Sequence, residues 1–243
     1  MNRNRLGAIA GLLAIVAVGA LAISGSDKRL GPRPPEKRPQ LALLTSLPLV
    51  FSESFGLEGG GSPALTRLEQ RYKVTPIGVT NAASLNGQKL LLMAHPRAQP
   101  AEMLVELDQW VRAGGHVLLL ADPKLEWDSE RPLGDRLRPP PAFADTGLLQ
   151  HWGLVLSGSR ADGPVSVQAG RFTLVAVSPG ALESRGRCKV TTARLVAHCR
   201  IGKGAATIIA DADFLNVEPS GKGDDGAQNL DFLADQLAQL ESR

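Results

Sequence analysis

The apolar and polar positions between residues 89 and 123 predict a strand, a helix and a second strand. Residues 90–93 and 117–121 are unbroken apolar runs, which are typical of strands buried on both faces of a parallel sheet. Between them, one apolar stripe at helical spacing consists of Met103, Leu104, Leu107, Trp110 and Val111. Pro100 suits the first turn of this helix, and the glycines at 114 and 115 suit its end. The unit is therefore a β-α-β crossover, right-handed by the general rule for such connections.

The same patterns predict the other elements of an α/β body at residues 40–243. Further strands are expected at 41–45, 73–79 and 205–210, with helices at 63–71, 146–152 and 229–240. A strand at 154–156, a hairpin at 165–177 and a β pair at 188–198 indicate a β-rich insertion at about 157–200. The proline- and arginine-rich stretch 124–145 is long for a loop, and loops of this length are usually lids or mobile segments. We expect a three-layer fold with a mostly parallel sheet.

The amino terminus predicts a membrane segment. A basic tail at residues 1–5 precedes an uncharged apolar run at 6–23, which is long enough to cross most of a bilayer's hydrocarbon core, roughly 30 Å thick. This run is either a single-pass transmembrane anchor, which we favour for its length, or a signal peptide cleaved near Ala20 and Ala22. Residues 24–39 form a linker rich in proline and basic residues.

The orientation of this segment is open to two interpretations. Five basic residues follow the apolar run and two precede it, so a literal positive-inside count would keep the body in the cytoplasm. The very short amino-terminal tail and the cysteine pair described below favour export. We therefore expect an inner-membrane protein with its body in the periplasm.

The net charge of +3 is confined to the amino-terminal segment. Residues 1–38 hold seven basic and two acidic side chains, a net of +5, which leaves 20 basic and 22 acidic side chains for the rest. The body is thus slightly acidic, which argues against a nucleic-acid-binding face.

Cys188 and Cys199 are the only cysteines, eleven positions apart in two predicted neighbouring strands. In an exported protein, such a pair predicts a disulfide. Closing so short a loop would contribute on the order of 2–3 kcal/mol. Two buried thiols and a metal or redox role are the alternatives, although no CxxC motif or histidine cluster supports the last of these.

His95, Asp122, Asp211 and Asp213 all follow predicted strands at their carboxyl ends. In open α/β sheets this edge holds the ligand crevice, so we expect the four residues to line a ligand or partner crevice. Three carboxylates and an imidazole could alternatively bind a divalent cation or act as an acid/base pair. The third possibility is structural, because aspartates after strands commonly cap the next turn.

The segment Leu43-Leu44-Thr45-Ser46-Leu47-Pro48 and the crossover ending Val111-Arg112-Ala113-Gly114-Gly115 resemble the auxiliary domain of uncharacterised ABC-type transport systems, including gliding-motility transporter-associated proteins. Residues 204–213, with Asn229 and the closing helix, are also similar to this group. The resemblance covers roughly residues 40–125 and 200–240. It implies a class I glutamine-amidotransferase-like, or flavodoxin-like, fold.

The same resemblance implies that the chain is not a catalyst. Amidotransferases carry a cysteine nucleophile after the strand equivalent to 117–121, where this chain has Asp122 and Pro123. They also carry a histidine with a glutamate after a later strand, where this chain has Asp211-Ala212-Asp213. A thiol nucleophile needs a nearby imidazole or cation, and none is evident from the sequence.

We therefore expect a non-catalytic, membrane-anchored binding or scaffolding subunit without a cofactor or metal. Its partners would be ABC transporter permease or ATPase components or other envelope proteins. The alternatives are a metal-assisted hydrolase using the strand-end acids, and a purely structural envelope protein that makes contact through the loop 124–145.

Overall fold

The computed structural model describes residues 29–51, 61–159, 161–191, 193–217 and 224–243. Residues 31–243 form one compact unit, which contains every element described below. The expected membrane segment at residues 6–23 lies outside the described residues. Within the described part of the chain, no helix combines the length and the apolarity needed to cross a membrane.

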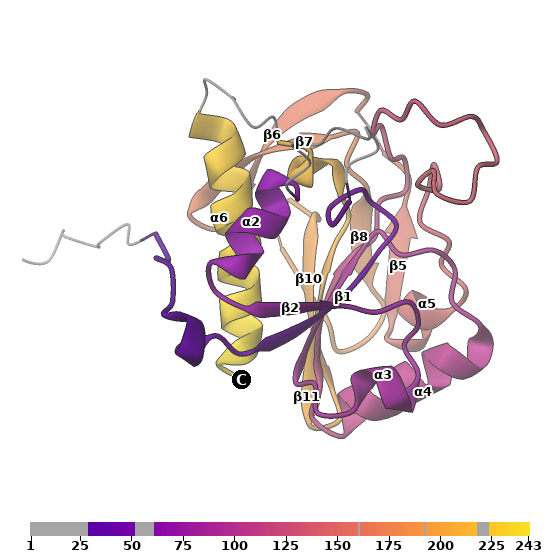
Figure 1. Ribbon diagram of the computed structural model, residues 1–243. Coiled ribbons are helices and arrows are strands. Elements are labelled where there is room, and N and C mark those ends of the chain that lie inside the picture. Colours follow the sequence, from indigo (N-terminus) through magenta and orange to yellow (C-terminus); the bar gives the residue numbers. More distant parts are fainter. Residues whose placement is uncertain (1–28, 52–60, 160, 192, 218–223) are drawn as a thin grey trace, which may run out of the picture. The chain divides into compact units, whose positions relative to one another are not determined.

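A seven-stranded sheet runs through the centre of the body (Figure 1). Its strands, in spatial order, are β2 (Lys73–Pro76), β1 (Gln40–Thr45), β3 (Leu90–Ala94), β4 (His116–Leu120), β11 (Gly204–Ile209), β10 (Val196–Ile201) and β9 (Lys189–Val190). The first five are parallel to one another, whereas β10 is antiparallel to both β11 and β9. The prediction of a mostly parallel central sheet is therefore confirmed.

The central strands are buried because helices cover both faces of the sheet. All residues of β3 and β11 are buried, as the unbroken apolar runs predicted. Helices α2 (Pro63–Glu69) and α6 (Asp224–Glu241) lie on one face, and α3 (Ala82–Leu85) and α4 (Ala101–Arg112) lie on the other (Figure 1). Short helical segments complete the set: η1 (Pro35–Lys37), α5 (Leu148–His151) and η2 (Asp213–Leu215).

Residues 154–184 form two small antiparallel sheets outside the central one. The first pairs β5 (Leu154–Ser157) with β8 (Ala181–Ser184), and the second pairs β6 (Pro164–Ala169) with β7 (Phe172–Val177). The hairpin expected at residues 165–177 is thus present. The β pair expected at 188–198 is also present, but its strands β9 and β10 extend the central sheet.

Two elements differ from the sequence-based expectation. Strand β2 ends at Pro76, not at residue 79, and the backbone N–H of Ile77 makes the last hydrogen bond to β1, at 2.9 Å to the carbonyl of Leu43. Helix α6 begins at Asp224, five residues before the predicted start, and it includes Gly226. A Cβ at Gly226 would lie 2.5 Å from Cγ1 of Val217, so the glycine allows the incoming chain to pack closely against the first turn.

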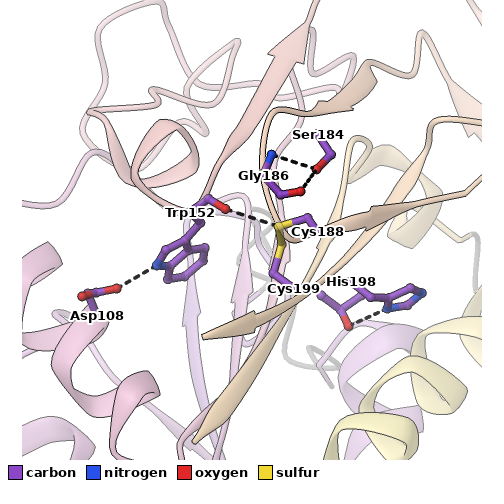
Figure 2. Close-up of a disulfide and its surroundings, with 8 residues drawn as sticks. Asp108, Trp152, Ser184, Gly186, Cys188, His198 and Cys199 are labelled. Carbon is purple, nitrogen blue, oxygen red and sulfur yellow. Dashed lines mark hydrogen bonds between the residues drawn. A yellow bond between two sulfur atoms is a disulfide. The ribbon is translucent and has the colours of Figure 1, made fainter. Parts of the chain in front are cut away.

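The expected disulfide joins Cys188 and Cys199, whose Cα atoms are 4.2 Å apart. Because β9 and β10 pair Lys189 with His198, the register places the two cysteines opposite each other at the end of that ladder. Figure 2 shows the sulfur of Cys188 facing the carbonyl oxygen of Trp152, at 3.3 Å. The indole of Trp152 in turn donates a 2.9 Å hydrogen bond to Asp108 on α4. The bridge therefore joins the two outermost strands at this edge of the sheet and lies against the α5 region.

Reducing this disulfide should lower the free energy of unfolding by about 2 kcal/mol, because the short closed loop limits the entropy of the unfolded chain. The measurement is urea denaturation with and without dithiothreitol. A Cys188→Ala/Cys199→Ala variant is the control, since it should show no response to the reductant. Two thiols titrating in the native, unreduced protein would contradict the prediction.

Candidate functional site

The structure places the four predicted site residues at the carboxyl edge of the central sheet. His95 follows β3, Asp122 lies just beyond β4, and Asp211 lies just beyond β11, so they follow three adjacent parallel strands. Asp213 is the first residue of η2. The side chains are buried: His95, Asp122 and Asp211 are 0 % exposed and Asp213 is 4 % exposed. The edge is therefore a covered polar layer.

Asp122 joins the ends of β4 and β11. Its Oδ1 accepts a 2.8 Å hydrogen bond from the backbone N–H of Lys124, which forms a turn directly after the strand. Its Oδ2 accepts a 2.8 Å hydrogen bond from the backbone N–H of Ala212. Burial raises the pKa of this carboxyl, and the backbone hydrogen bonds lower it against that trend. Both carboxylate oxygens thus have backbone partners.

Asp211 joins the central sheet to the β6–β7 hairpin. Its Oδ2 accepts from the backbone N–H of Val177 at 2.8 Å, and its Oδ1 accepts from that of Phe214 at 2.9 Å. Burial raises the pKa of Asp211 well above its ordinary value, and the neighbouring charge of Asp122 raises it further. Like Asp122, this residue has both oxygens bound to backbone donors from different elements.

Asp213 has only one of its two oxygens bonded. Its Oδ2 accepts a 2.8 Å hydrogen bond from the backbone N–H of Glu126, whereas its Oδ1 is buried without a partner among the described residues. The pKa of Asp213 is raised to about 7, chiefly by burial. The hydrogen bond from Glu126 lowers it, and the charges of Asp122 and Glu126 raise it further. Near neutral pH this carboxyl is therefore partly protonated.

His95 stands apart from the three aspartates in its interactions. Its Nε2 lies 2.8 Å from the carbonyl oxygen of Pro140, which can only accept, so Nε2 carries the proton. Burial lowers the pKa of the ring, against the hydrogen bond to Pro140, and this lowering favours the neutral form; its buried Nδ1 has no hydrogen-bond partner among the described residues. The backbone of His95 is left-handed, with φ of 45°, which turns the chain sharply after β3.

The crossover point of the strand order lies between β1 and β3, where open α/β sheets commonly bind ligands. Here hydrogen bonds close the space between the two strand ends. The hydroxyl of Thr45 donates to the carbonyl of Ala94 at 2.9 Å, and the hydroxyl of Ser46 donates to the carbonyl of His95 at 2.5 Å. Two side-chain-to-backbone hydrogen bonds thus connect the ends of β1 and β3 directly.

The proline-rich loop forms a cover over this edge. Besides the contact with His95, the N–H of Phe143 donates to the carbonyl of Asp122 at 2.6 Å, and the N–H of Leu125 donates to that of Pro141 at 2.9 Å. The base of the loop is thereby fixed to the strand ends. Hollows of about 440, 370 and 270 Å³ lie elsewhere on the body, and none of these three is lined by a predicted site residue.

Sequence reasoning missed three polar side chains at this edge, those of Ser178, Glu126 and Lys124. The hydroxyl of Ser178 donates a 2.6 Å hydrogen bond to Glu126, and the ammonium of Lys124 lies 2.9 Å from the same carboxylate oxygen. Ser178 is buried and left-handed, with φ of 45°. The Ser178-Pro179-Gly180 sequence signals a turn, but nothing in the sequence places that turn beside residue 126.

The arrangement is suited to holding elements together. Across the described residues, no group of three or more histidine, cysteine, aspartate or glutamate side chains is placed to hold a metal ion. The carboxylates instead accept hydrogen bonds from backbone donors of the loop, the β6–β7 hairpin and η2. These hydrogen bonds are of the kind expected for aspartates that cap turns after strands, one of the roles considered from the sequence.

Fold and edge together define a mixed α/β domain whose strand ends are covered and internally hydrogen-bonded. The chain belongs to the family described as an ABC-type uncharacterized transport system, whose sequence profile matches residues 38–161, half of the chain. That family suggests an auxiliary component of such a transport system. No protein with a curated description matches the sequence.

Solved structures share the fold at low sequence identity. The mmIFT52 N-terminal domain has a TM-score of 0.54 and 14% identity, over 84% of this chain and 98% of that one. Cytoplasmic protein STM3548 from Salmonella typhimurium has a TM-score of 0.51 and 10% identity, over 83% and 98%. Gan42B, a GH42 β-galactosidase from G. stearothermophilus, has a TM-score of 0.50 and 16% identity, over 86% of this chain and 30% of that one. These likenesses concern the fold alone.

Proposed function

We propose that this chain is a non-catalytic, membrane-anchored binding and scaffolding subunit of an ABC-type transport system. Family membership supports the link to transport. The order of the parallel strands and the helices on both sheet faces are compatible with the amidotransferase-like shell implied by the sequence resemblance. In this proposal the apolar run at residues 6–23 anchors the chain in the inner membrane, with the body in the periplasm.

The observation that carries the non-catalytic role is how the strand-end acids are used. Asp122 and Asp211 each accept two backbone hydrogen bonds from separate elements, and both are fully buried. A general acid or base must reach a substrate, directly or through one water. Both cysteines are joined in the disulfide, which leaves no thiol to act as a nucleophile. These features favour a structural role, in which the carboxyl edge of the sheet is a rigid base for a binding surface.

We assign that binding surface to the tip of the loop over the carboxyl edge. Leu133 is 87 % exposed and Leu137 is 66 % exposed. Among the described residues, no large apolar side chain is more exposed than that of Leu133. The base of this loop is fixed by the bonds to His95, Asp122 and Asp213. Exposed leucines on a fixed support are typical of a protein-binding surface, since they lose little conformational entropy on binding.

Replacing both leucines with aspartate should abolish recovery of the transporter components from detergent-solubilised membranes, with at least a tenfold loss in capture. A charge placed in an apolar contact loses its hydration without gaining a partner. The measurement is affinity capture of the full chain followed by mass spectrometry of ATPase and permease subunits.

A matched control is Val79→Asp/Val105→Asp, which also adds two aspartates at exposed apolar positions but on other elements. Both double variants should unfold at the wild-type urea concentration. Capture that survives in Leu133→Asp/Leu137→Asp would show that the loop tip is not the contact. If the wild-type chain recovers no transporter component, the proposed function itself fails.

A further inference from the structure

Basic side chains gather at the end of the central sheet opposite the loop. We define the amino edge as the residues at the amino ends of the parallel strands and at the carboxyl end of β10: Gln40, Lys73, Lys89, His116, Arg200 and Lys203. No acidic side chain belongs to this set. Its four lysine and arginine side chains are exposed and have no ion-pair partner within the described part of the chain. This contrasts with the slightly acidic composition of the body as a whole.

A hollow of about 370 Å³ opens within the amino edge. It is lined by His116, Arg200, Lys203 and Arg243, with Gly204 and Ala205 supplying backbone. Burial lowers the pKa of His116, a hydrogen bond to the carbonyl of Leu240 opposes this, and the charges of Arg243 and Lys89 lower the pKa further. Two cationic side chains thus lie near enough to His116 to act on its imidazole. Such a surface is suited to phosphate groups.

The body's chain begins at this same edge. The carbonyl of Gly31 accepts a 2.5 Å hydrogen bond from Arg71, two residues before β2. Arg33 binds both carboxylate oxygens of Glu241, at the end of α6, at 2.9 Å. The backbone N–H of Lys73 donates to the carbonyl of Pro39 at 2.8 Å. Gly31 and the residues that follow it are therefore held next to the amino edge.

The short distance along the chain to the apolar run limits how far this edge can lie from a bilayer. Residues 24–30 separate the run from Gly31, and seven residues span at most about 25 Å when fully extended. If residues 6–23 lie in the membrane, Gly31 and the amino edge beside it are kept within that reach of the bilayer. The loop with Leu133 and Leu137 lies at the opposite, carboxyl edge of the sheet.

We infer that the amino edge is a docking surface for an anionic phospholipid bilayer, with lipid phosphates held by Lys89, Arg200 and Lys203 around the hollow. This inference rests on the membrane anchor of the proposed function. Each basic side chain near an anionic bilayer surface contributes about 1 kcal/mol, and the attraction falls off within a Debye length of about 8 Å at physiological salt. The anchor keeps the body near the bilayer, and the basic amino edge then determines which side of the body faces the lipid.

The test is lysine footprinting of the full chain reconstituted in vesicles. A water-soluble amine-reactive reagent is applied to proteoliposomes of phosphatidylcholine alone or with 30% phosphatidylglycerol, and the modification rate of each lysine is followed by mass spectrometry. We expect Lys89 and Lys203 to react at least threefold more slowly in the anionic vesicles, with full recovery in 0.5 M NaCl. Lys124, at the carboxyl edge, should react equally in both and serves as the internal reference.

Two matched charge reversals sharpen the result. Lys203→Glu should abolish the protection of Lys89, whereas Arg136→Glu, at an exposed position on the opposite edge, should leave it intact. Equal reactivity of Lys89 and Lys203 in both kinds of vesicle would overturn the docking surface. Equal protection by inorganic phosphate without vesicles would also overturn it, because the hollow would then be a site for a small anion.

Flotation of the same vesicles in 0.5 M NaCl separates this inference from the proposed anchor. A chain that floats at high salt but shows no protection is anchored without docking. A chain that shows protection at low salt but does not float at high salt docks without the anchor, and the proposed anchoring then fails alone.

Discussion

Asp122→Ala is expected to lower the free energy of unfolding by about 3 kcal/mol, because it leaves one buried and one partly buried backbone N–H group without acceptors. These donors belong to Lys124 and Ala212, on opposite sides of the junction between β4 and β11. Asp122→Asn should cost less, about 1 kcal/mol, since its single carbonyl oxygen can keep one of the two hydrogen bonds. The expected order of stability is therefore wild type, asparagine variant, alanine variant.

Urea denaturation at pH 7 measures this order, and hydrogen exchange locates its cause. The amide of Ala212 should exchange faster in the alanine variant, while the amides of β1, on the far side of β3, should keep their relative protection. Asp162→Ala is the control, because the Asp162 side chain is 88 % exposed and pairs only with exposed Lys124. An alanine variant as stable as wild type would show that the polar layer does not hold the strand ends together.

Asp213→Asn should have the opposite effect and raise the free energy of unfolding at pH 8 by about 3 kcal/mol. The wild-type carboxyl has a pKa of about 7 in the folded protein, against an ordinary value of 3.8, chiefly because burial disfavours its charged form. An amide carries no charge to bury, and its oxygen can still accept the N–H of Glu126, which Oδ2 accepts in the wild type. The variant thus keeps the contact and removes the charge.

The sign of the pH dependence follows from the raised pKa. A group that holds its proton more tightly in the folded state contributes stability below its unfolded pKa, and this contribution is lost as the pH rises through the folded pKa. The advantage of Asp213→Asn over wild type should therefore grow between pH 4 and pH 8 and be less than about 1 kcal/mol at pH 4. Urea denaturation at both pH values is the measurement, and Asp162→Asn is the control. A variant less stable than wild type at pH 8 would contradict this account.

Much of the fold could be predicted because its strongest signals are local. The unbroken apolar runs of β3, β4 and β11 require burial on both faces, and only a covered parallel sheet provides it. The small sheet of β5 and β8 was harder, because Ala181–Ser184 has two exposed residues and pairs with a strand 27 positions away from its start, a contact that no local pattern encodes.

The position of the strand-end aspartates could be predicted from the sequence, but their hydrogen-bond partners could not. A strand that ends in aspartate places that side chain at the carboxyl edge of the sheet, so Asp122 and Asp211 could be located from the sequence. Which backbone groups donate hydrogen bonds to them depends on how distant parts of the chain fold back. Val177 lies 34 positions from Asp211, and Ala212 lies 90 positions from Asp122. The same holds for His95, whose partner Pro140 lies 45 positions away in the loop.

The two outermost strands of the central sheet limit how copies of this protein could associate. Strand β2 has four residues, begins with exposed Lys73 and ends with Pro76, and β9 has two residues. A strand from another molecule would find few free amides and carbonyls along either border, and a lysine ammonium would lose hydration there. Open-ended polymerisation through a continuous intermolecular sheet is thereby disfavoured, so the protein can reach a high local concentration without forming fibres.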